Sequence, residues 1–466
     1  MNRYDDPIST VLARYAAGMR LEDVPPAVLQ RAKLHILDAL GVALASSTEE
    51  FAHRILNGIA GLAGRGDYPV IGFPARLPIR DAALVNGALV HGIDFDDTHA
   101  AGVVHVSASA LPAALAAAQS IGGGGRELLL AYLLCVESSS RIAIAARGGF
   151  HVNGFHPTGM VGAFGAVLGV GRLWGLNERQ LADAQGLVLS QASGSFEFIE
   201  DGAWNKRLHP GWAVGAAMTA CTLAKAGVVG ARLAYEGRYG LFKSYLGDHW
   251  EPDLPACTAG LGSTWEMTQV ALKPYPVCHF NHAFIDAALA LRKTHGFAAD
   301  DIESIQALIG RDQIGIVCEP EANKRRPRNP YDARFSLHFA IATALVLGRF
   351  TMDEVAEATL QDPRIRQLCD RIGYTIDERS AYPVHYSGTL VVRLRDGRTL
   401  THVEAINRGS HAKPLSADEV VEKFHQTASR ALPPHQAEAL VATVLGLESL
   451  TDLGPLACTP GPRLPA

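Results

Sequence analysis

The densest cluster of potentially reactive side chains lies between His91 and His105. The run HGIDFDDTH places His91, Asp94 and Thr98 ahead of His105. At about 3.6 residues per turn, a continuous helix would bring His91, Asp94 and Thr98 onto one face. Imidazole and carboxylate groups that face one another can move a proton, so this cluster predicts acid–base chemistry.

Two other interpretations of this cluster stay open, a solvated helix end and a metal site. As a calcium-binding EF-hand loop the run is defective. It has His99 where that loop needs a glycine, and His105 where it needs a glutamate. A metal is therefore the weaker alternative, and we expect no metal site.

A second histidine, His156, precedes Pro157 in the run GFHPTG. Because proline favours the first turn of a helix, His156 should lie at or beside a helix N-terminus. Backbone N–H groups are free there and can bind an anion, while the imidazole can exchange protons near neutral pH. A capping histidine without chemistry is the alternative.

Three potential cations, Lys206, Arg207 and His209, stand directly before the apolar run 212–218. Burying an unpaired charge is costly, so cations between apolar helices need an anionic partner. The segment therefore predicts a clamp for an anion.

A fourth cluster, KPYPVCH, holds Lys273, Tyr275, Cys278 and His279. Its two prolines make a rigid turn that could aim Lys273 across a crevice between domains, where ligand sites commonly lie. For Cys278 we favour packing over a role as a nucleophile.

Several other classes of protein do not fit. The sequence has no G-x-S-x-G, P-loop or H-E-x-x-H motif, and the glycines of 169–175 miss the dinucleotide-binding spacing. A net charge of −5 gives no basic footprint for nucleic acid. Seven scattered cysteines without a C-x-x-C pair disfavour disulfide, zinc and iron–sulfur frameworks and fit a reducing cytoplasm.

The sequence also shows no membrane-spanning segment and no export signal. The uncharged run 157–171 is glycine-rich and shorter than the roughly 20 apolar residues that a spanning helix needs. The N-terminal run MNRYDDPIST lacks the basic and apolar regions of a signal peptide. We expect a soluble, cytoplasmic protein.

The elements that must position these residues are mostly helical. Apolar residues recur at helical spacing over the first 245 residues or so, and the later predicted helices cover 82–95, 108–119, 127–147, 158–173, 178–192 and 211–226. Many are apolar all round and rich in alanine and glycine, which is typical of helices buried in a large bundle. A large helical domain is therefore expected.

The pattern changes after 248–263, which is rich in proline and glycine. Predicted strands at 270–277, 302–309, 389–394 and 398–403 alternate with helices near 281–294 and 336–347. A capping-box spacing at Ser416–Glu419 then begins helices that run to about 447. We expect a mainly α protein, with a helical domain at 1–262, an α+β domain at 263–408, and helices of 409–466 that return to the first domain.

These groups together fit a polyanionic substrate with a labile proton. Lysines from both domains would hold carboxylates and stabilise the enolate-like charge that forms when a proton next to a carboxylate leaves. A histidine or Asp94 could act as the base, and a second acid could protonate a departing hydroxyl.

The sequence resembles the MmgE/PrpD family, which includes 2-methylcitrate dehydratase, cis-aconitate decarboxylase and iminodisuccinate epimerase. The motifs that carry the resemblance are GIDFDDTH (92–99), HVSASALPAALA (105–116), GFHPTG (154–159), KRLHPGWA (206–213), YEGRYGLF (235–242) and KPYPVCHFNHA (273–283). The resemblance implies a large helical domain made from both chain ends, a smaller α+β lid, a homodimer and no cofactor.

The resemblance also implies roles for individual residues. Those expected to be catalytic are Asp94, Thr98, His105, His156, Lys206 and Lys273. Those expected to bind substrate are His91, Arg207, His209, Tyr275, Cys278 and His279. One departure concerns a histidine that some decarboxylases place after the second lysine motif. Here that position falls near Val277 and Cys278, with His279 as an approximate substitute.

The sequence therefore predicts a cofactor-free lyase that removes water from a small hydroxy-polycarboxylate such as 2-methylcitrate or citrate. Decarboxylation of cis-aconitate and epimerisation of an imino or amino diacid are the alternatives within the family. A non-catalytic helical binding protein is the alternative of another class. It predicts that Lys206 and Lys273 are exposed and share no pocket with His105 and His156.

Overall fold

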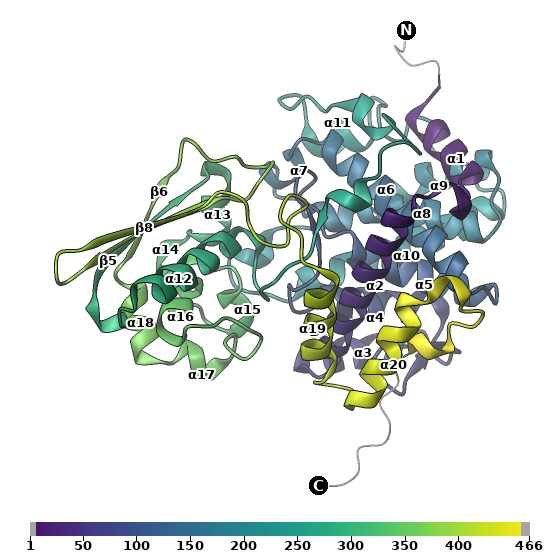
Figure 1. The fold of residues 1–466 in the computed structure, drawn as a ribbon. Helices are drawn as coiled ribbons and strands as arrows, with labels where there is room; N and C mark the ends of the chain where they lie inside the picture. Colours follow the sequence, from purple (N-terminus) through teal and green to yellow (C-terminus); the bar gives the residue numbers. More distant parts are fainter. Residues whose placement is uncertain (1–5, 458–466) are drawn as a thin grey trace.

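The structure is a computed structural model, and it describes residues 6–457. The chain forms a helical lobe and a smaller lobe with a sheet, and the first and last described α-helices, Ile8–Gly18 and Pro434–Leu445, both belong to the helical lobe (Figure 1). The mainly helical fold and the α+β region in the C-terminal half, both expected from the sequence, are confirmed. The N-terminal residues 1–5 and Cys458 lie outside the described residues.

The first half of the chain supplies most of the helical lobe. Its helices are α1 (Ile8–Gly18), α2 (Pro26–Ser47), α3 (Glu50–Ala63), α4 (Ile79–His91), α5 (Ser107–Ser120), α6 (Gly125–Ala145), α7 (Gly149–Val152), α8 (Pro157–Leu173), α9 (Glu178–Val188), α10 (Asn205–Lys225) and α11 (Leu241–Leu246). Its short strands are β1 (Tyr68–Pro69), β2 (Arg76–Leu77) and β3 (Thr98–His99). The helices predicted from periodicity are present, but α4 and α9 end four residues earlier than expected.

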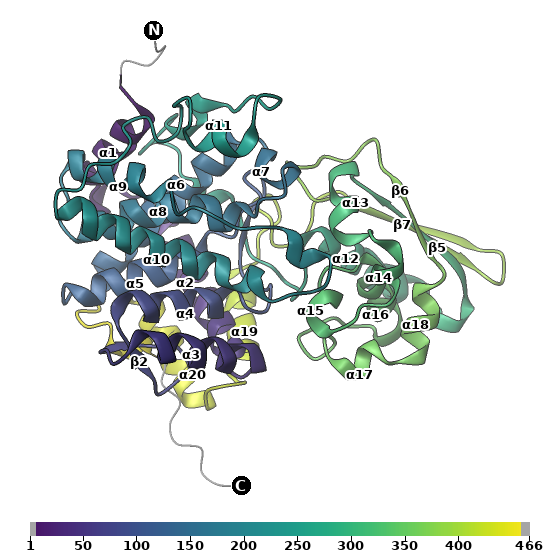
Figure 2. The ribbon, with the colours of Figure 1, turned by 180° about the vertical axis from the view of Figure 1, so that it is seen from behind.

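Glycine lets the central helices approach closely. A Cβ at Gly165 of α8 would lie 2.0 Å from Ser139 Oγ of α6, and one at Gly169 would lie 2.4 Å from Cys135 Sγ. Only a residue without a side chain fits such distances. This close packing agrees with the buried, alanine- and glycine-rich helices that the sequence predicts. Figure 2 shows α10 running beside α8 and α5 in this bundle, and α10 also packs against α4.

In the part of the chain that the structure describes, one helix, α6, is long and apolar enough to cross a membrane. Its most apolar window, however, is 89% buried inside the structure. All-round hydrophobicity is the expected property of a helix in the middle of a bundle. Helix α6 is therefore a core element.

The second lobe follows a short strand, β4 (Val270–Ala271), which pairs with β3. Its helices are α12 (His282–His295), α13 (Arg311–Val317), α14 (Glu321–Arg325), α15 (Pro330–Ala333), α16 (Leu337–Leu347), α17 (Glu357–Leu360) and α18 (Pro363–Cys369). Its strands are β5 (Ile302–Ile309), β6 (Ile372–Ile376), β7 (Gly388–Leu394) and β8 (Thr399–Glu404). We refer to this lobe as the lid.

The sheet of the lid has the order β6-β5-β7-β8. Strands β5 and β6 are parallel and the other pairs are antiparallel, so the sheet is mixed. The hairpin predicted at Asp396-Gly397 joins β7 to β8, with Gly397 at φ 91°. The strand predicted over 270–277 is wrong beyond Ala271, because Pro274 and Pro276 cannot donate ladder hydrogen bonds.

The chain finally returns to the helical lobe. Helix α19 (Ala417–Ala428) packs against α2, and α20 (Pro434–Leu445) packs against α2 and α19. Lys33 of α2 fixes this return by donating to Leu445 O at 3.0 Å and by pairing with Glu448. We keep the boundaries near residues 262 and 408 as a proposal.

The cysteines agree with a packing role. Cys135, Cys221, Cys257, Cys318 and Cys369 are buried, and within residues 6–457 no cysteine forms a disulfide. Burial also raises the pKa of these thiols, to about 12 for Cys135 and Cys369. They are inert core residues.

Candidate active site

A cavity lies between the helical lobe and the lid. Among its lining residues are eight that the sequence singled out: Asp94, Thr98, His105, His156, Lys206, Lys273, Cys278 and His279. All six residues expected to be catalytic therefore line one cavity.

Asp94 does not lie on a helix, contrary to the expectation that His91, Asp94 and Thr98 share one helical face. Helix α4 ends at His91, and Thr98 belongs to strand β3. Asp94 lies between them at φ 52°, a left-handed conformation that costs a non-glycine residue about 1–3 kcal/mol. The segment Ile93–Asp97 is thus a strained loop, which we call the acid loop.

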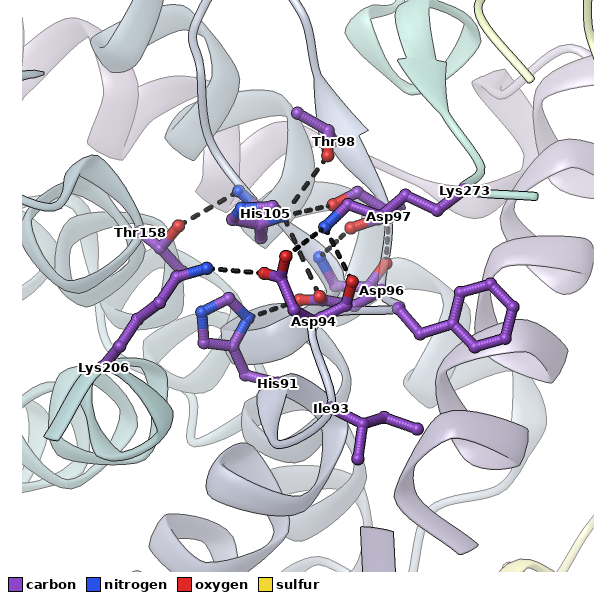
Figure 3. A network of polar contacts seen from close by, with 12 residues as sticks. His91, Ile93, Asp94, Asp96, Asp97, Thr98, His105, Thr158, Lys206 and Lys273 are labelled. Carbon is purple, nitrogen blue, oxygen red and sulfur yellow. Dashed lines mark hydrogen bonds and ion pairs between the residues drawn. The ribbon is translucent and has the colours of Figure 1, made fainter. Parts of the chain in front are cut away.

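The carboxylate of Asp94 joins two lysines that come from different lobes (Figure 3). Lys206 Nζ donates to Asp94 Oδ1 at 2.5 Å, and Lys273 Nζ lies 3.3 Å from Asp94 Oδ2. The exposed fractions of Asp94, Lys206 and Lys273 are 1%, 4% and 0%. Burial favours the neutral form of the acid, but the two lysines outweigh it and hold the pKa of Asp94 well below its usual value.

Local packing explains how each lysine reaches the acid loop. Gly87 of α4 faces Gly211 of α10, so closely that a Cβ at Gly87 would lie 2.8 Å from the Gly211 backbone. This approach brings Lys206, in the first turn of α10, beside the loop that follows α4. On the other side, the pairing of β3 with β4 sets Ala271 opposite Thr98, and Lys273 follows two residues later.

His105 has the hydrogen bonds of a base that faces the cavity. Its Nδ1 lies 2.7 Å from the carbonyl oxygen of Asp97 and 3.3 Å from Thr98 Oγ1. A carbonyl only accepts, so Nδ1 carries the proton and Nε2 keeps its lone pair. Burial, reinforced by Lys273 and Lys206 against the opposing charge of Asp96, holds the pKa of His105 well below its usual value. The free imidazole is neutral.

His156 is the N-cap residue of α8, with Pro157 following it, as expected. A hydrogen bond of 3.0 Å joins its Nδ1 to Nδ1 of His209, while its Nε2 is buried and has no hydrogen-bond partner among the described residues. Burial and the neighbouring His209 hold the pKa of His156 well below its usual value. His209 supports His156 from behind and does not line the cavity.

His91 also stands behind the cavity wall. Its ring stacks on that of His156 at 5.4 Å between centroids, and its Nδ1 lies 2.7 Å from Asp96 Oδ2. Nε2 of His91 has no hydrogen-bond partner within residues 6–457. Burial opposes ionisation of Asp96, but His91 and His105 overcome it and lower the pKa of this acid.

Among residues 6–457, one group of side chains could hold a metal ion. Ligand atoms of His91, Asp96 and His105 lie within 4.8 Å of one another, and two histidines with one carboxylate are a common set for transition metals. Both Nδ1 atoms, however, are already engaged, that of His91 by Asp96 and that of His105 by Asp97 O. An ion bound through these atoms would have to displace both hydrogen bonds.

Two further residues expected to bind substrate lie away from the cavity. The guanidinium of Arg207 is held between the rings of Phe51 and Tyr331, at 4.0 and 3.9 Å from their centroids. The hydroxyl of Tyr275 donates to Asp286 Oδ1 at 2.6 Å. Both side chains are therefore engaged by other residues of the protein, and neither lines the cavity.

Cys278 and His279 reach the cavity from the lid. Asn407 Nδ2 donates to Nε2 of His279 at 2.7 Å, which leaves the proton of a neutral His279 on Nδ1. Burial and nearby Lys273 lower the pKa of His279 to about 3. Burial and nearby Asp94 raise the pKa of the Cys278 thiol, which favours packing over a role as a nucleophile.

Sequence patterns missed the rest of the cavity wall. These residues are Val103, His151, Phe196, Phe280, Ile316, Phe335 and Tyr386. Most are apolar and come from loops or short helices of both lobes, so no spacing along the chain relates them. The cavity thus has cations and imidazoles on one part of its wall and aromatic rings on another.

Comparisons with known proteins find one family and several of its enzymes. The MmgE/PrpD N-terminal domain matches residues 10–253, and the MmgE/PrpD C-terminal domain matches residues 275–449. Human cis-aconitate decarboxylase is 28% identical over 93% of this chain and 90% of its own length. The cis-aconitate decarboxylase of Aspergillus terreus is 24% identical over 96% of this chain and 95% of its own. A 2-methylcitrate dehydratase from Cupriavidus necator is 28% identical over only 39% of each chain.

Proposed function

The chain belongs to the MmgE/PrpD family, and from this premise we propose that it is a lyase that decarboxylates a small unsaturated polycarboxylate, with cis-aconitate as the first candidate. The observation that carries the proposal is the enclosure of Lys206, Lys273 and the neutral imidazole of His105 in one cavity. Lysines there bind carboxylates, and an imidazole beside them moves a proton.

The charge balance of the cavity favours the uptake of a proton when a polycarboxylate binds. Asp94 neutralises one of the two lysine charges, so a bound tricarboxylate adds more negative charge than the lysines cancel. Negative charge beside an imidazole raises its pKa. His105 or His156 then takes up a proton on substrate binding and becomes a general acid.

The reaction that follows balances atoms and charge. In cis-aconitate, the bond between the methylene carbon and its carboxylate breaks, and carbon dioxide leaves. The electron pair moves across the double bond towards the far carboxylate, where Lys206 or Lys273 stabilises the added negative charge. A protonated histidine then delivers a proton to the carbon beside that carboxylate, and the enzyme regains its proton from solvent.

The aromatic part of the wall supports loss of carbon dioxide. A carboxylate held against Phe196, Phe280 or Phe335 loses the water that stabilises its charge. Carbon dioxide is neutral and needs little hydration, so the apolar wall disfavours the carboxylate relative to the product. The full-length similarity to cis-aconitate decarboxylases adds to this argument.

Dehydration of a hydroxy-polycarboxylate, the main prediction from the sequence, is the second candidate. The same base and lysines could start it, and the partial similarity to 2-methylcitrate dehydratases favours it to a smaller degree. Epimerisation has less support. The non-catalytic alternative is wrong in its structural expectation, because Lys206 and Lys273 are buried and share the cavity with His105 and His156.

The test is to incubate the purified protein with cis-aconitate, 2-methylcitrate, citrate and iminodisuccinate in deuterated water. We expect carbon dioxide from cis-aconitate and one deuterium in a methylene dicarboxylate product. Water loss from citrate or 2-methylcitrate without carbon dioxide would overturn decarboxylation in favour of dehydration. Deuterium exchange alone would indicate epimerisation. The homodimer and the cytoplasmic location stay predictions.

A further inference from the structure

Three consecutive backbone carbonyls of the acid loop each accept a hydrogen bond from a cation. Arg334 Nη1 donates to Ile93 O at 2.6 Å, Lys273 Nζ to Asp94 O at 3.0 Å, and Lys423 Nζ to Phe95 O at 2.8 Å. The contact from Lys273 is drawn in Figure 3. The three donors come from three distant parts of the chain: the end of α15, the segment after β4, and α19.

Lys423 is buried where α19 meets α2. Its Nζ lies 2.7 Å from Asp38 Oδ1 of α2 and 3.8 Å from the centroid of the Phe95 ring. Lys423 does not line the cavity, so it has no direct access to a substrate there. Its contacts with the active site go through the backbone and the ring of Phe95.

The acid loop needs such support. It carries three buried carboxylates within four residues, and Asp94 has a left-handed backbone. The ionised carboxylates of Asp94 and Asp96 repel each other, and the loop is outside any helix or longer strand that would satisfy its carbonyls. Cations that donate to those carbonyls oppose the repulsion and fix the backbone at the same time.

We propose that Lys423 and Arg334 are positioning residues, which hold the acid loop so that Asp94 meets Lys206 and Lys273. The same loop supplies the Asp97 carbonyl that fixes the tautomer of His105. A loosened loop therefore disturbs both the anion-binding lysines and the base. As far as catalysis is concerned, this inference rests on the proposed function.

The experiment uses a charge-balanced double variant, Lys423→Met with Asp38→Asn. Removing the lysine alone would leave Asp38 buried without its cation, a large and unspecific loss. Asp38→Asn alone is the first control, because it keeps the bond from Lys423 to Phe95 O. Lys33→Met is the second control. It removes another tie between α2 and the C-terminal helices, and its contacts are with Leu445 and Glu448, far from the acid loop in sequence.

Two measurements separate positioning from general stability. Hydrogen–deuterium exchange of peptides that span 92–99 should become faster in the double variant and stay unchanged in Lys33→Met. The value of kcat/KM for cis-aconitate should fall about tenfold or more in the double variant, at a temperature where every variant is folded. Lys423→Arg should recover most of the activity, because arginine can donate to the same carbonyl.

Unchanged exchange over 92–99 in the double variant would overturn the proposal, whatever the substrate is. Equal losses of kcat/KM in Lys33→Met would overturn it too, since the effect would then be structural. If the wild type shows no decarboxylation but the exchange of 92–99 responds as expected, the proposed function fails and the positioning role stands.

Discussion

At the scale of single residues, the active site depends on how one carboxylate shares two lysines. Asp94 keeps both ammonium groups in place before a substrate arrives, so neither has to be ordered when it binds. Preorganised charge is what stabilises an enolate-like intermediate most strongly. Burying this acid in a left-handed backbone conformation lowers the stability of the fold, and the surrounding cations offset that loss.

Replacing Lys206 by alanine tests this arrangement. We expect kcat/KM for the preferred polycarboxylate to fall by about 100-fold or more, because one preorganised cation is lost. The protein should stay folded, since Lys273 still pairs with Asp94. Lys225→Ala is the matched control. That lysine ends the same helix, is exposed and donates only to Trp174 O. Full activity in Lys206→Ala would remove the anion-binding argument.

The buried histidines also predict how stability depends on pH. Burial lowers the pKa of His209 and His279 to about 3 from an ordinary 6.5. Between pH 6.5 and 3 the unfolded chain therefore binds protons that the folded chain does not, and the free energy of unfolding falls as the pH falls. Asp97 acts in the opposite direction, because burial raises its pKa to about 7 and the folded state keeps its proton below that pH.

The measurement is the melting temperature of the protein at pH 7.5, 6.5 and 5.5. The wild type should lose stability towards acid, and His209→Gln should lose less over the same range, because it removes one group that the unfolded state protonates. His435→Gln, at an exposed site on α20, should follow the wild type. A slope for His209→Gln equal to that of the wild type would contradict the argument.

At the scale of elements, the fit between α6 and α8 makes a clear prediction. Gly165→Ala should lower the free energy of unfolding by about 1–3 kcal/mol, because the new Cβ would meet Ser139 Oγ and the Cys135 carbonyl. Gly58→Ala, on the exposed face of α3 with nothing within 4 Å, should raise it by about 0.5–1 kcal/mol. Urea titrations measure both, and a neutral Gly165→Ala would mean that the helices can separate without cost.

Much of this architecture could be predicted from the sequence, because buried helices and hairpins leave a periodic signal. The end of α4 left a weaker signal. Gly92 follows the last helical residue directly and is a stop signal, but Ile93 and Phe95 continue the apolar pattern beyond it. The cations that cap the carbonyls of the acid loop come from far along the chain, so tertiary contacts stabilise a backbone that local propensity does not favour.

The residues of the active site also differ in whether the sequence could predict them. Lys206 could be found because a cation beside an apolar run needs an anion. The same signal marks Arg334, before the apolar helix α16, and Lys423, on the buried stripe of α19 with Val420, Phe424 and Thr427. A cation beside an apolar run, looked for over the whole sequence, therefore identifies both Arg334 and Lys423. The aromatic wall of the cavity could not be found this way, because it forms only when the two lobes meet.

At the scale of the whole molecule, the cavity exists because the two lobes hold each other. Lys273 and Arg334 reach from the lid to the acid loop, and the hydroxyl of Tyr386 donates to Ala100 O at 3.0 Å. A ligand that touches both walls adds to these contacts in the folded state alone. Its binding free energy therefore adds to the stability of the whole chain.

A saturated tricarboxylate, propane-1,2,3-tricarboxylate, tests this without turnover, since it lacks the double bond that would accept the electron pair. At about 100 times its Kd it should add about 2.7 kcal/mol to the free energy of unfolding and raise the melting temperature. Sodium chloride at equal ionic strength controls for screening. In Lys206→Ala the shift should shrink to that of the salt control, because the ligand loses one of its two cations. An undiminished shift in that variant would place the bound tricarboxylate elsewhere than in the cavity between the lobes.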